Sequence, residues 1–373
     1  MKKLYKIVIF VVAALMLFTS CNGGDVVSID TTVASESVSE SSSEQPTETQ
    51  KAETTYKNLW TYKQDGGVSV REITVNTDKG GDDVVIVQLT DMHLSWVNDT
   101  DLKDPVINST YNNRKWGRDG EFWDNAKTCL DYAEGIGADQ IVLTGDIYDY
   151  LTSETVQRVN QYIFNAYDNI MACLGNHEVV KAMGEENRYT NWKDIVAGRI
   201  NTFKDSWANT DGDGDVFYSK KVLGDKVMLI QMDNGSFGGF WDSQVERFRE
   251  DLATARENGY AVLLFYHIPI CTDNPQYEKA VSKKLGTYDE SNATYDFYNK
   301  GATRFSAGAS GEICKLIYEN GDIIKGTFCG HLHNDYYTEI LASSPSGAQT
   351  RIPQYLIAAT AYDNGHALRI TVK

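Results

Sequence analysis

Two of the six histidines in this chain, His331 and His333, fall within one three-residue window of the stretch FCGHLHNDYYTEI. Imidazole nitrogen is a common ligand of divalent metals and exchanges protons near neutral pH, so a close pair suits metal binding or proton transfer. A solvated turn is the alternative, because IIKGTF before the pair and YYTEIL after it also suit the arms of a β-hairpin. The residues that follow other apolar runs decide between these interpretations.

Similar polar residues follow four other apolar runs. Together with the first run, the five runs and their polar residues are VVIVQL with Asp91 and His93, QIVLT with Asp146 and Asp149, NIMACL with Asn176 and His177, AVLLFY with His267, and DIIKGTF with His331 and His333. Each set alone could be a turn, a helix cap or a buried structural histidine. Open α/β sheets bind their ligands at the carboxyl ends of strands, so five such sets together indicate one shared site.

Short, β-branched apolar runs predict the strands that position these residues. They cover residues 84–89, 140–144, 169–174, 226–232, 261–266 and 322–328. Helix-like stretches lie near residues 122–135, 153–166, 243–258 and 309–319, and Asp242 or Ser243 suits the cap of the third. The alternation of strand and helix predicts an α/β fold.

The ordered motifs D-x-H, GDxxD, GNHE, a lone His and GHxH resemble the calcineurin-like metallophosphoesterase family, from about Val84 to His333. The resemblance implies a four-layer fold of two packed β-sheets flanked by helices, with two metal ions at the strand ends. It also implies metal-dependent hydrolysis of phosphate esters, with a metal-bound hydroxide as the nucleophile. Two ions ~3.5–4 Å apart can clamp a phosphate and activate a bridging water.

The same resemblance assigns a role to each motif residue. Asp91, His93 and His333 would hold the first metal, Asn176, His267 and His331 the second, and Asp146 would bridge them. Carboxylates mixed with imidazoles suit Mn, Fe or Zn better than Ca.

His177 would not bind metal but would contact the phosphate and protonate the leaving oxygen. Asp149 and Glu178 would orient His177 or the metal ligands. Asp335, just beyond the histidine pair, is better explained as part of a solvated turn.

The substrate class is less defined. Tyr150 stands where Ser/Thr protein phosphatases carry Arg, and Asp149 stands where purple acid phosphatases carry a tyrosine ligand. The motifs DMHL and GDIYD also resemble those of phosphodiesterases and nucleases that act on nucleotides or phospholipid headgroups. A surface binding lipoprotein without catalysis is a further alternative. A small phosphate ester is the expected partner, whereas nucleic acid is disfavoured by the charge of −14 on residues 57–373.

The N-terminal region reads as an export signal. Residues 1–21 carry three lysines, an apolar run and then Thr-Ser-Cys, which resembles a bacterial lipobox with Cys21 as the lipidated residue. An uncleaved anchor helix is the alternative. Residues 22–56 are rich in Ser, Thr and Glu and predict a disordered tether for a catalytic domain at 57–373. We therefore expect an extracytoplasmic lipoprotein anchored to the bacterial cell membrane.

Cysteines, two long segments and three basic residues lie outside the motifs. The domain contains five cysteines: Cys129, Cys173, Cys271, Cys314 and Cys329. Their number is odd and none has CxxC spacing, which favours buried free thiols over disulfides. Residues 96–120 and 268–305 are long and aromatic, as lids over a site often are. Arg114, Lys115 and Arg118 suit either an anionic group or plain solvation.

Two further polar features have an ordinary explanation available. Asp233 and Asn234 suit either a pocket lining or a turn, because they follow another strand-like run. His366 suits a structural position near the final strand.

Overall fold

The computed structural model describes residues 61–207, 215–270 and 308–373. The predicted signal, tether and lipidation site at Cys21, together with Cys271 and most of the predicted lid at 268–305, lie outside these ranges. Within them, no helix is both long and apolar enough to cross a bilayer.

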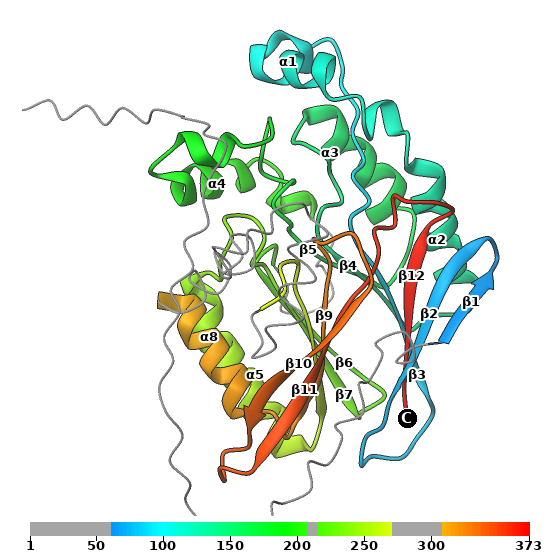
Figure 1. Ribbon diagram of the computed structural model, residues 1–373, viewed down its shortest axis with the longest axis vertical. Coiled ribbons are helices and arrows are strands. Elements are labelled where there is room, and N and C mark those ends of the chain that lie inside the picture. Colours follow the sequence, from blue (N-terminus) through cyan, green and yellow to red (C-terminus); the bar gives the residue numbers. More distant parts are fainter. Residues whose placement is uncertain (1–60, 208–214, 271–307) are drawn as a thin grey trace, which may run out of the picture. The chain divides into compact units, whose positions relative to one another are not determined.

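Two six-stranded mixed sheets form the centre of the domain (Figure 1). The first has the order β1-β2-β12-β3-β4-β5, with bounds Thr61–Asp65, Val68–Val75, His366–Val372, Val84–Leu89, Gln140–Thr144 and Ile170–Cys173. The second has the order β10-β11-β9-β8-β7-β6, with bounds Tyr336–Ser343, Gln349–Leu356, Ile324–Cys329, Ala261–Phe265, Val227–Met232 and Tyr218–Leu223. The runs β3-β4-β5 and β7-β8-β9 are parallel, so their carboxyl ends meet at the same edge of each sheet.

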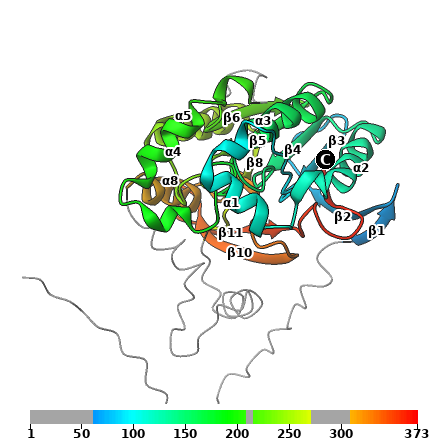
Figure 2. The same cartoon turned by 90° about the horizontal axis from the view of Figure 1, so that it is seen from above.

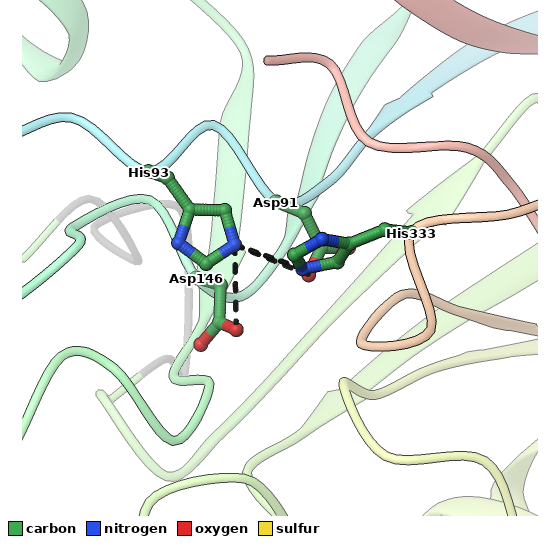
Figure 3. A group of neighbouring side chains, drawn as sticks. All are labelled: Asp91, His93, Asp146 and His333. Atoms are coloured by element: carbon green, nitrogen blue, oxygen red, sulfur yellow. Dashed lines mark hydrogen bonds and ion pairs between the residues drawn. The ribbon is translucent and has the colours of Figure 1, made fainter. Parts of the chain in front are cut away.

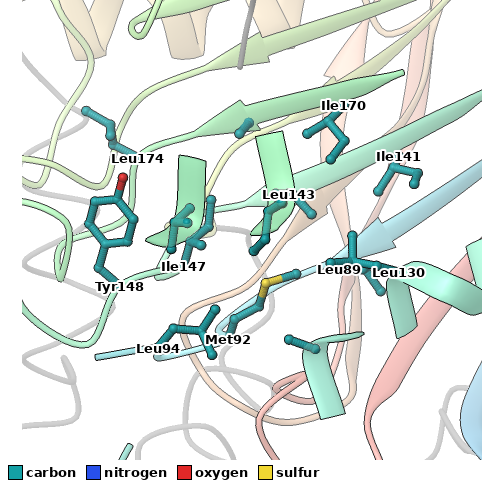
Figure 4. Packing of buried hydrophobic residues seen from close by; sticks show 14 of the residues in the cluster. Leu89, Met92, Leu94, Leu130, Ile141, Leu143, Ile147, Tyr148, Ile170 and Leu174 are labelled. Carbon is teal, nitrogen blue, oxygen red and sulfur yellow. The ribbon is translucent and has the colours of Figure 1, made fainter. Parts of the chain in front are cut away.

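The inner strands are mostly apolar because both of their faces are covered. Residues such as Ile86, Val142, Leu229 and Leu263 form the core between the two sheets. The outer face of the first sheet packs on α2 (Trp123–Gly135) and α3 (Ser153–Val159), as the cluster around Leu89, Leu130 and Leu143 illustrates (Figure 4). Helices α5 (Asp242–Asn258) and α8 (Gly308–Glu319) cover the second sheet. The predicted four-layer α/β sandwich is therefore confirmed.

Buried polar side chains join the two sheets near the edge that carries the motifs. Gln88 donates to the Cys329 carbonyl at 3.1 Å and to the Thr144 hydroxyl at 2.9 Å. Gln231 donates to the Leu143 carbonyl at 2.9 Å. Apolar packing alone allows sheets to slide, whereas buried hydrogen bonds of this kind define one arrangement of the strand ends.

The predicted elements agree with the structure to within one or two residues, with three corrections. The stretch near 153–166 is α3 followed by a π-helical turn, Asn160–Phe164, and not one continuous helix. The cap of α5 is Trp241, whose N–H donates to Gln244 Oε1, and Asp242 is already helical. The hairpin interpretation of the histidine pair is wrong, because β11 lies between β9 and β10.

Two shorter helices lie on the loops that leave the motif edge. Helix α1 (Pro105–Asn113) follows β3, and α4 (Trp192–Ile200) follows β5; both are visible from above in Figure 2. The four described cysteines, Cys129, Cys173, Cys314 and Cys329, are buried and free, which confirms the thiol prediction for them.

Candidate metal centre

Five strand ends from both sheets supply the candidate ligands. Asp91, Asp146, His267 and His331 each stand two residues beyond the end of β3, β4, β8 and β9, respectively. Asn176 follows β5 in the same way, at three residues. The paired sheets bring these loops together, so residues up to 240 positions apart become neighbours.

The first group consists of Asp91, His93, Asp146 and His333, whose ligand atoms all lie within 4.8 Å of one another (Figure 3). Nε2 of His333 is 2.9 Å from Nε2 of His93 and 3.2 Å from Oδ1 of Asp91. Nε2 of His93 lies 3.8 Å from carboxylate oxygens of both Asp91 and Asp146. Four potential ligand atoms thus surround one small space.

The second group consists of Asp146, His267 and His331. Nε2 of His267 lies 3.2 Å from Oδ2 of Asp146, 3.1 Å from Nδ1 of His331 and 3.2 Å from Oδ1 of Asn176. The structure therefore places His331 and His333 in different groups. Asp146 is the residue common to both.

Hydrogen bonds on the outer nitrogen orient two of the rings. Nδ1 of His93 lies 3.1 Å from Oδ1 of Asp149, and Nδ1 of His267 lies 2.8 Å from the Thr144 carbonyl oxygen. A ring that donates from Nδ1 presents an Nε2 lone pair, so both rings direct acceptors toward Asp146. Acceptors that converge on carboxylates call for a cation between them.

The spacing and the charge of the donor set fit metal ions. Two ligand atoms at ~2.1 Å from one ion, separated by a right or tetrahedral angle, are roughly 3.0–3.4 Å apart, close to the separations given above. Burial lowers the pKa of His93 to about 4, so the ring is neutral as a metal ligand must be. Burial also opposes a proton on His267, yet the Asp146 carboxylate raises its pKa to about 10. Asp146 therefore attracts positive charge, which a metal ion would supply.

The backbone of the candidate ligands is strained. Five of them have positive φ angles: Asp91 at 52°, His93 at 48°, Asp146 at 50°, His331 at 73° and His333 at 52°. This left-handed region is unfavourable for side chains with a Cβ atom, and such residues cluster at functional sites. The surrounding contacts hold these turns in place.

Two motif glycines are needed because the turns pack against each other. A Cβ atom on Gly330 would collide with the Thr90 hydroxyl and the Asp91 carboxylate. One on Gly175 would collide with the Asp146 carboxylate. A side chain at either position would displace a candidate ligand.

Glu178 holds the loop that carries Asp146. Its buried carboxylate accepts from the main-chain N–H groups of Asp146 at 3.1 Å, Ile147 at 2.5 Å and Gly175 at 2.6 Å. Burial, and then the charge of Asp146, raises the pKa of Glu178 to about 7. Glu178 thus fixes the GDxxD turn without pointing into either group.

Asp149 connects three cationic or potentially cationic groups. Its carboxylate is paired with the Arg114 guanidinium, with Nη2 at 2.6 Å from Oδ1, and accepts from Nδ1 of His93. Burial opposes the charge, but Arg114 and the two histidines hold the pKa of Asp149 well below its usual range. Its carboxylate thus contacts both Arg114 and His93 beside the first group.

His177 is held beside both groups. Its N–H donates to Oδ1 of Asp146 at 2.9 Å, its Nδ1 lies 2.7 Å from the Asp149 carbonyl oxygen, and its Nε2 is 3.9 Å from Oδ2 of Asp146. Burial disfavours a charged ring, yet the carboxylates of Asp146 and Asp149 raise its pKa to about 9. His93, Asp149 and His177 also have ligand-like spacing, but the Arg114 pair already neutralises Asp149.

Other residues singled out in the sequence lie elsewhere. The solvated-turn interpretation of Asp335 is wrong: its carboxylate pairs with the buried Arg71 guanidinium and accepts from the Ala358 N–H at 2.9 Å. Asp233 forms a buried turn, accepting from Gly235 and Ser236 N–H groups at 3.0 Å each.

The remaining candidates take structural positions. Asn234 exchanges hydrogen bonds with the main chain of Ile268, next to His267. His366 is buried at the start of β12, 3.0 Å from Nη1 of Arg71. Of the three cations, Arg114 reaches the site, Lys115 is exposed, and Arg118 contacts Tyr111 and Asp119.

Sequence reasoning missed two aromatic residues at the centre. The Tyr362 hydroxyl lies 3.0 Å from Nδ1 of His333, and the Trp116 ring lies 4.5 Å from His93 and 6.1 Å from His333 between centroids. Neither belongs to a motif, and Tyr362 arrives from the loop before β12. Trp116 belongs to the aromatic segment 96–120, which the sequence predicts as a lid, but no local pattern distinguishes either residue from its neighbours.

Comparison with known proteins adds the following. A family model described as calcineurin-like phosphoesterase matches residues 84–335. Similar solved structures include a dimetal phosphatase from Danio rerio, at 12% identity over 76% of this chain and 90% of that chain, with a TM-score of 0.42. A purple acid phosphatase from yellow lupin seeds has 12% identity over 69% of this chain and 39% of its own, with a TM-score of 0.42. No curated protein matches the chain.

Proposed function

The chain belongs to the calcineurin-like phosphoesterase family and is a metallophosphoesterase, and we propose that it hydrolyses small phosphate esters at a centre of two divalent ions. The position of Asp146 carries this proposal. Its carboxylate is within 3.8 Å of Nε2 in His93 and 3.2 Å of Nε2 in His267, so one residue joins both groups of ligands. A carboxylate placed between two ligand groups can bind both ions of a two-ion centre.

The chain's own residues would hold the ions as two neighbouring sets. Asp91, His93 and His333 would bind one ion, and Asn176, His267 and His331 the other, with Asp146 between them. The mixture of carboxylate oxygen, amide oxygen and imidazole nitrogen favours Mn, Fe or Zn. When bound, such a pair of ions supplies charge neutralisation for the phosphate and activation of a water molecule.

His177 would deliver the proton to the leaving oxygen. Asp146 fixes its main chain and Asp149 fixes its ring, so Nε2 is the remaining functional atom and faces the space between the groups. With Nδ1 held by the Asp149 carbonyl oxygen, Nε2 is the atom that would carry and release the proton, as a general acid needs.

Metal analysis of an Asp146→Asn variant tests the proposal. The wild type should hold about two ions per chain, and the variant should lose both ions and the hydrolysis of a phosphate-ester panel supplied with Mn. Asp225→Asn is the matched control, because Asp225 has the same backbone conformation, with φ at 51°, and lies in the turn between β6 and β7. A variant that keeps both ions, or a wild type that binds only one, would contradict a shared carboxylate.

We also propose that Cys21 carries a lipid that anchors the domain to the extracytoplasmic side of the membrane. The support is the order of charged, apolar and small residues in 1–21, followed by the Ser/Thr/Glu-rich segment 22–56. A fatty-acid analogue should label the wild type and leave Cys21→Ser unlabelled. Equal labelling of both would reject the lipid anchor and leave the proposed hydrolysis untouched.

A further inference from the structure

A cavity of about 360 Å³ lies at the end of helix α1, lined by Ser109, Thr110, Asn113, Arg114 and Met183. The hydroxyl of Thr110 donates to the Lys181 carbonyl oxygen at 2.8 Å. Lys181 in turn pairs with Asp104 at the start of α1, at 2.7 Å. Helix α1 is thus fastened to the segment that follows His177, and the cavity lies between them.

Arg114 connects this cavity with the candidate centre. The same guanidinium that lines the cavity is paired through Nε and Nη2 with the Asp149 carboxylate. Asp149 contacts the rings of both His93 and His177. The Arg114–Asp149 pair is therefore the link between the cavity and the rings of His93 and His177.

Arg114 is the one charged side chain that lines the cavity, and one edge of its guanidinium is paired with Asp149. None of its five lining residues is acidic, although residues 57–373 carry a net charge of −14. Nη1 of Arg114 has no hydrogen-bond partner among the residues that the structure describes, and the side chain is 26% exposed. The face of Trp116, 5.0 Å from the guanidinium carbon, helps to fix its plane. A preorganised guanidinium edge of this kind binds carboxylate or phosphate oxygen strongly.

We propose that this cavity holds the leaving part of the substrate, and that this part carries a second anionic group, either a carboxylate or a phosphate. The inference rests on the proposed function, because it takes His177 as the donor to the leaving oxygen. The volume of the cavity is within the range of small-molecule sites, roughly 300–1,000 Å³. Ser109 and Asn113 add neutral polar contacts, and the Nη1 side of Arg114, which is not bonded to Asp149, supplies the charge-assisted hydrogen bond that selects the ligand.

Three phosphate monoesters of similar size test the charge preference: glycerol 3-phosphate, 3-phosphoglycerate and 1,3-propanediol bisphosphate. Two of the esters, 3-phosphoglycerate and 1,3-propanediol bisphosphate, carry a second anionic group. The wild type should hydrolyse at least one of these two with a kcat/KM about ten-fold above that of glycerol 3-phosphate, which is the effect of one charge-assisted hydrogen bond. The ester that is preferred identifies carboxylate or phosphate as the recognised group. Arg114→Gln should remove the preference, mainly through KM.

A merely structural role for Arg114 gives a different result. If Arg114 only orients Asp149, then Arg114→Gln lowers kcat for all three esters by one common factor, and the inference is overturned. Hydrolysis by the wild type without any preference overturns it as well. A wild type that hydrolyses no ester of any kind, with or without Mn, refutes the proposed function instead.

A steric variant tests the cavity independently of the ion pair. Ser109→Trp fills the cavity from an exposed helix position and should raise KM for the preferred anionic ester by about ten-fold or more. Asn108→Trp is the matched control, since Asn108 is exposed on the same helix and does not line the cavity. Equal effects of the two tryptophans, or none from Ser109→Trp, would overturn the location.

Discussion

The two groups of candidate ligands are supported in different ways. In the first, side chains hold the rings: Asp149 contacts Nδ1 of His93, and the Tyr362 hydroxyl contacts Nδ1 of His333. In the second, the main chain holds His267 through the Thr144 carbonyl oxygen. The first group is therefore open to adjustment by single substitutions away from the ligands, whereas the second is fixed by the course of β4 itself.

The two groups also differ in charge and exposure. The first has Asp91 as a carboxylate of its own besides the shared Asp146, while the second has only the shared one. Asp91 is buried, and although burial opposes its charge, His333 lowers its pKa to about 2. His333 is 24% exposed, whereas the His267 side chain is fully buried. We therefore expect the first ion to bind more tightly than the second, although the first group is the more exposed of the two.

The largest effect in this set should come from His177, which is assigned no metal. The Asp149 carbonyl oxygen holds its ring, whereas the Asp149 carboxylate holds the His93 ring. His177→Asn should lower kcat by roughly 10²–10⁴ while metal content stays near two ions per chain. The loss should be greatest for alkyl phosphates, whose leaving oxygen needs a proton, and smaller for nitrophenyl phosphates. Loss of metal would instead identify His177 as a metal ligand. Equal slowing of both esters would limit its role to stabilising the charge of the phosphate.

Asp149→Asn should break the contrast between side-chain and main-chain support. The first ion should bind about 10- to 100-fold more weakly because His93 loses its anionic partner, and the second ion should be unaffected. The second ion is the internal control, because the Thr144 carbonyl oxygen and not Asp149 holds His267. Stepwise metal titration by calorimetry measures both affinities. Equal weakening of the two ions by Asp149→Asn would remove the distinction.

Chelation of the wild type should sharpen the difference in carboxylate number. As a chelator is increased, the second ion should leave first, because only one carboxylate serves it when the first group is occupied. Metal content followed against chelator concentration should show a plateau near one ion per chain. Repeating the titration with His267→Ala should leave the tighter step only; a single two-ion step in the wild type would contradict the unequal groups.

Tyr362→Phe should give the smallest effect. Its hydroxyl lies 3.0 Å from Nδ1 of His333, so its removal costs about one neutral hydrogen bond and should weaken the binding of the first ion about 3- to 10-fold. The exposed position of the ring makes a folding defect a poor explanation for such a change. Metal titration of Tyr337→Phe provides a matched control outside the centre. An unchanged first affinity would show that His333 needs no support from this loop.

Much of the fold could be predicted from the chain's local patterns. The strands β3, β4, β7, β8 and β9 stand where β-branched apolar runs predict them, because a strand buried on both faces is apolar along its whole length. The edge strands were harder to assign. In β10 and β11, buried and exposed residues alternate only in part, and the pairing of β11 between β9 and β10 has no local signal.

The sequence by itself determined the turn that follows each inner strand. Such a turn needs positive φ angles, glycines where two loops pack closely, and polar side chains, and neighbouring residues supply all of these. Tertiary structure decided which of these turns meet. His93 contacts His333 across 240 positions, and Asp335 pairs with Arg71 across 264, where the sequence suggested a solvated turn. Tyr362 and the Arg114 cavity were also beyond prediction. Local turns are encoded by neighbouring residues, whereas contacts between distant loops depend on the order in which strands pair and the sheets pack.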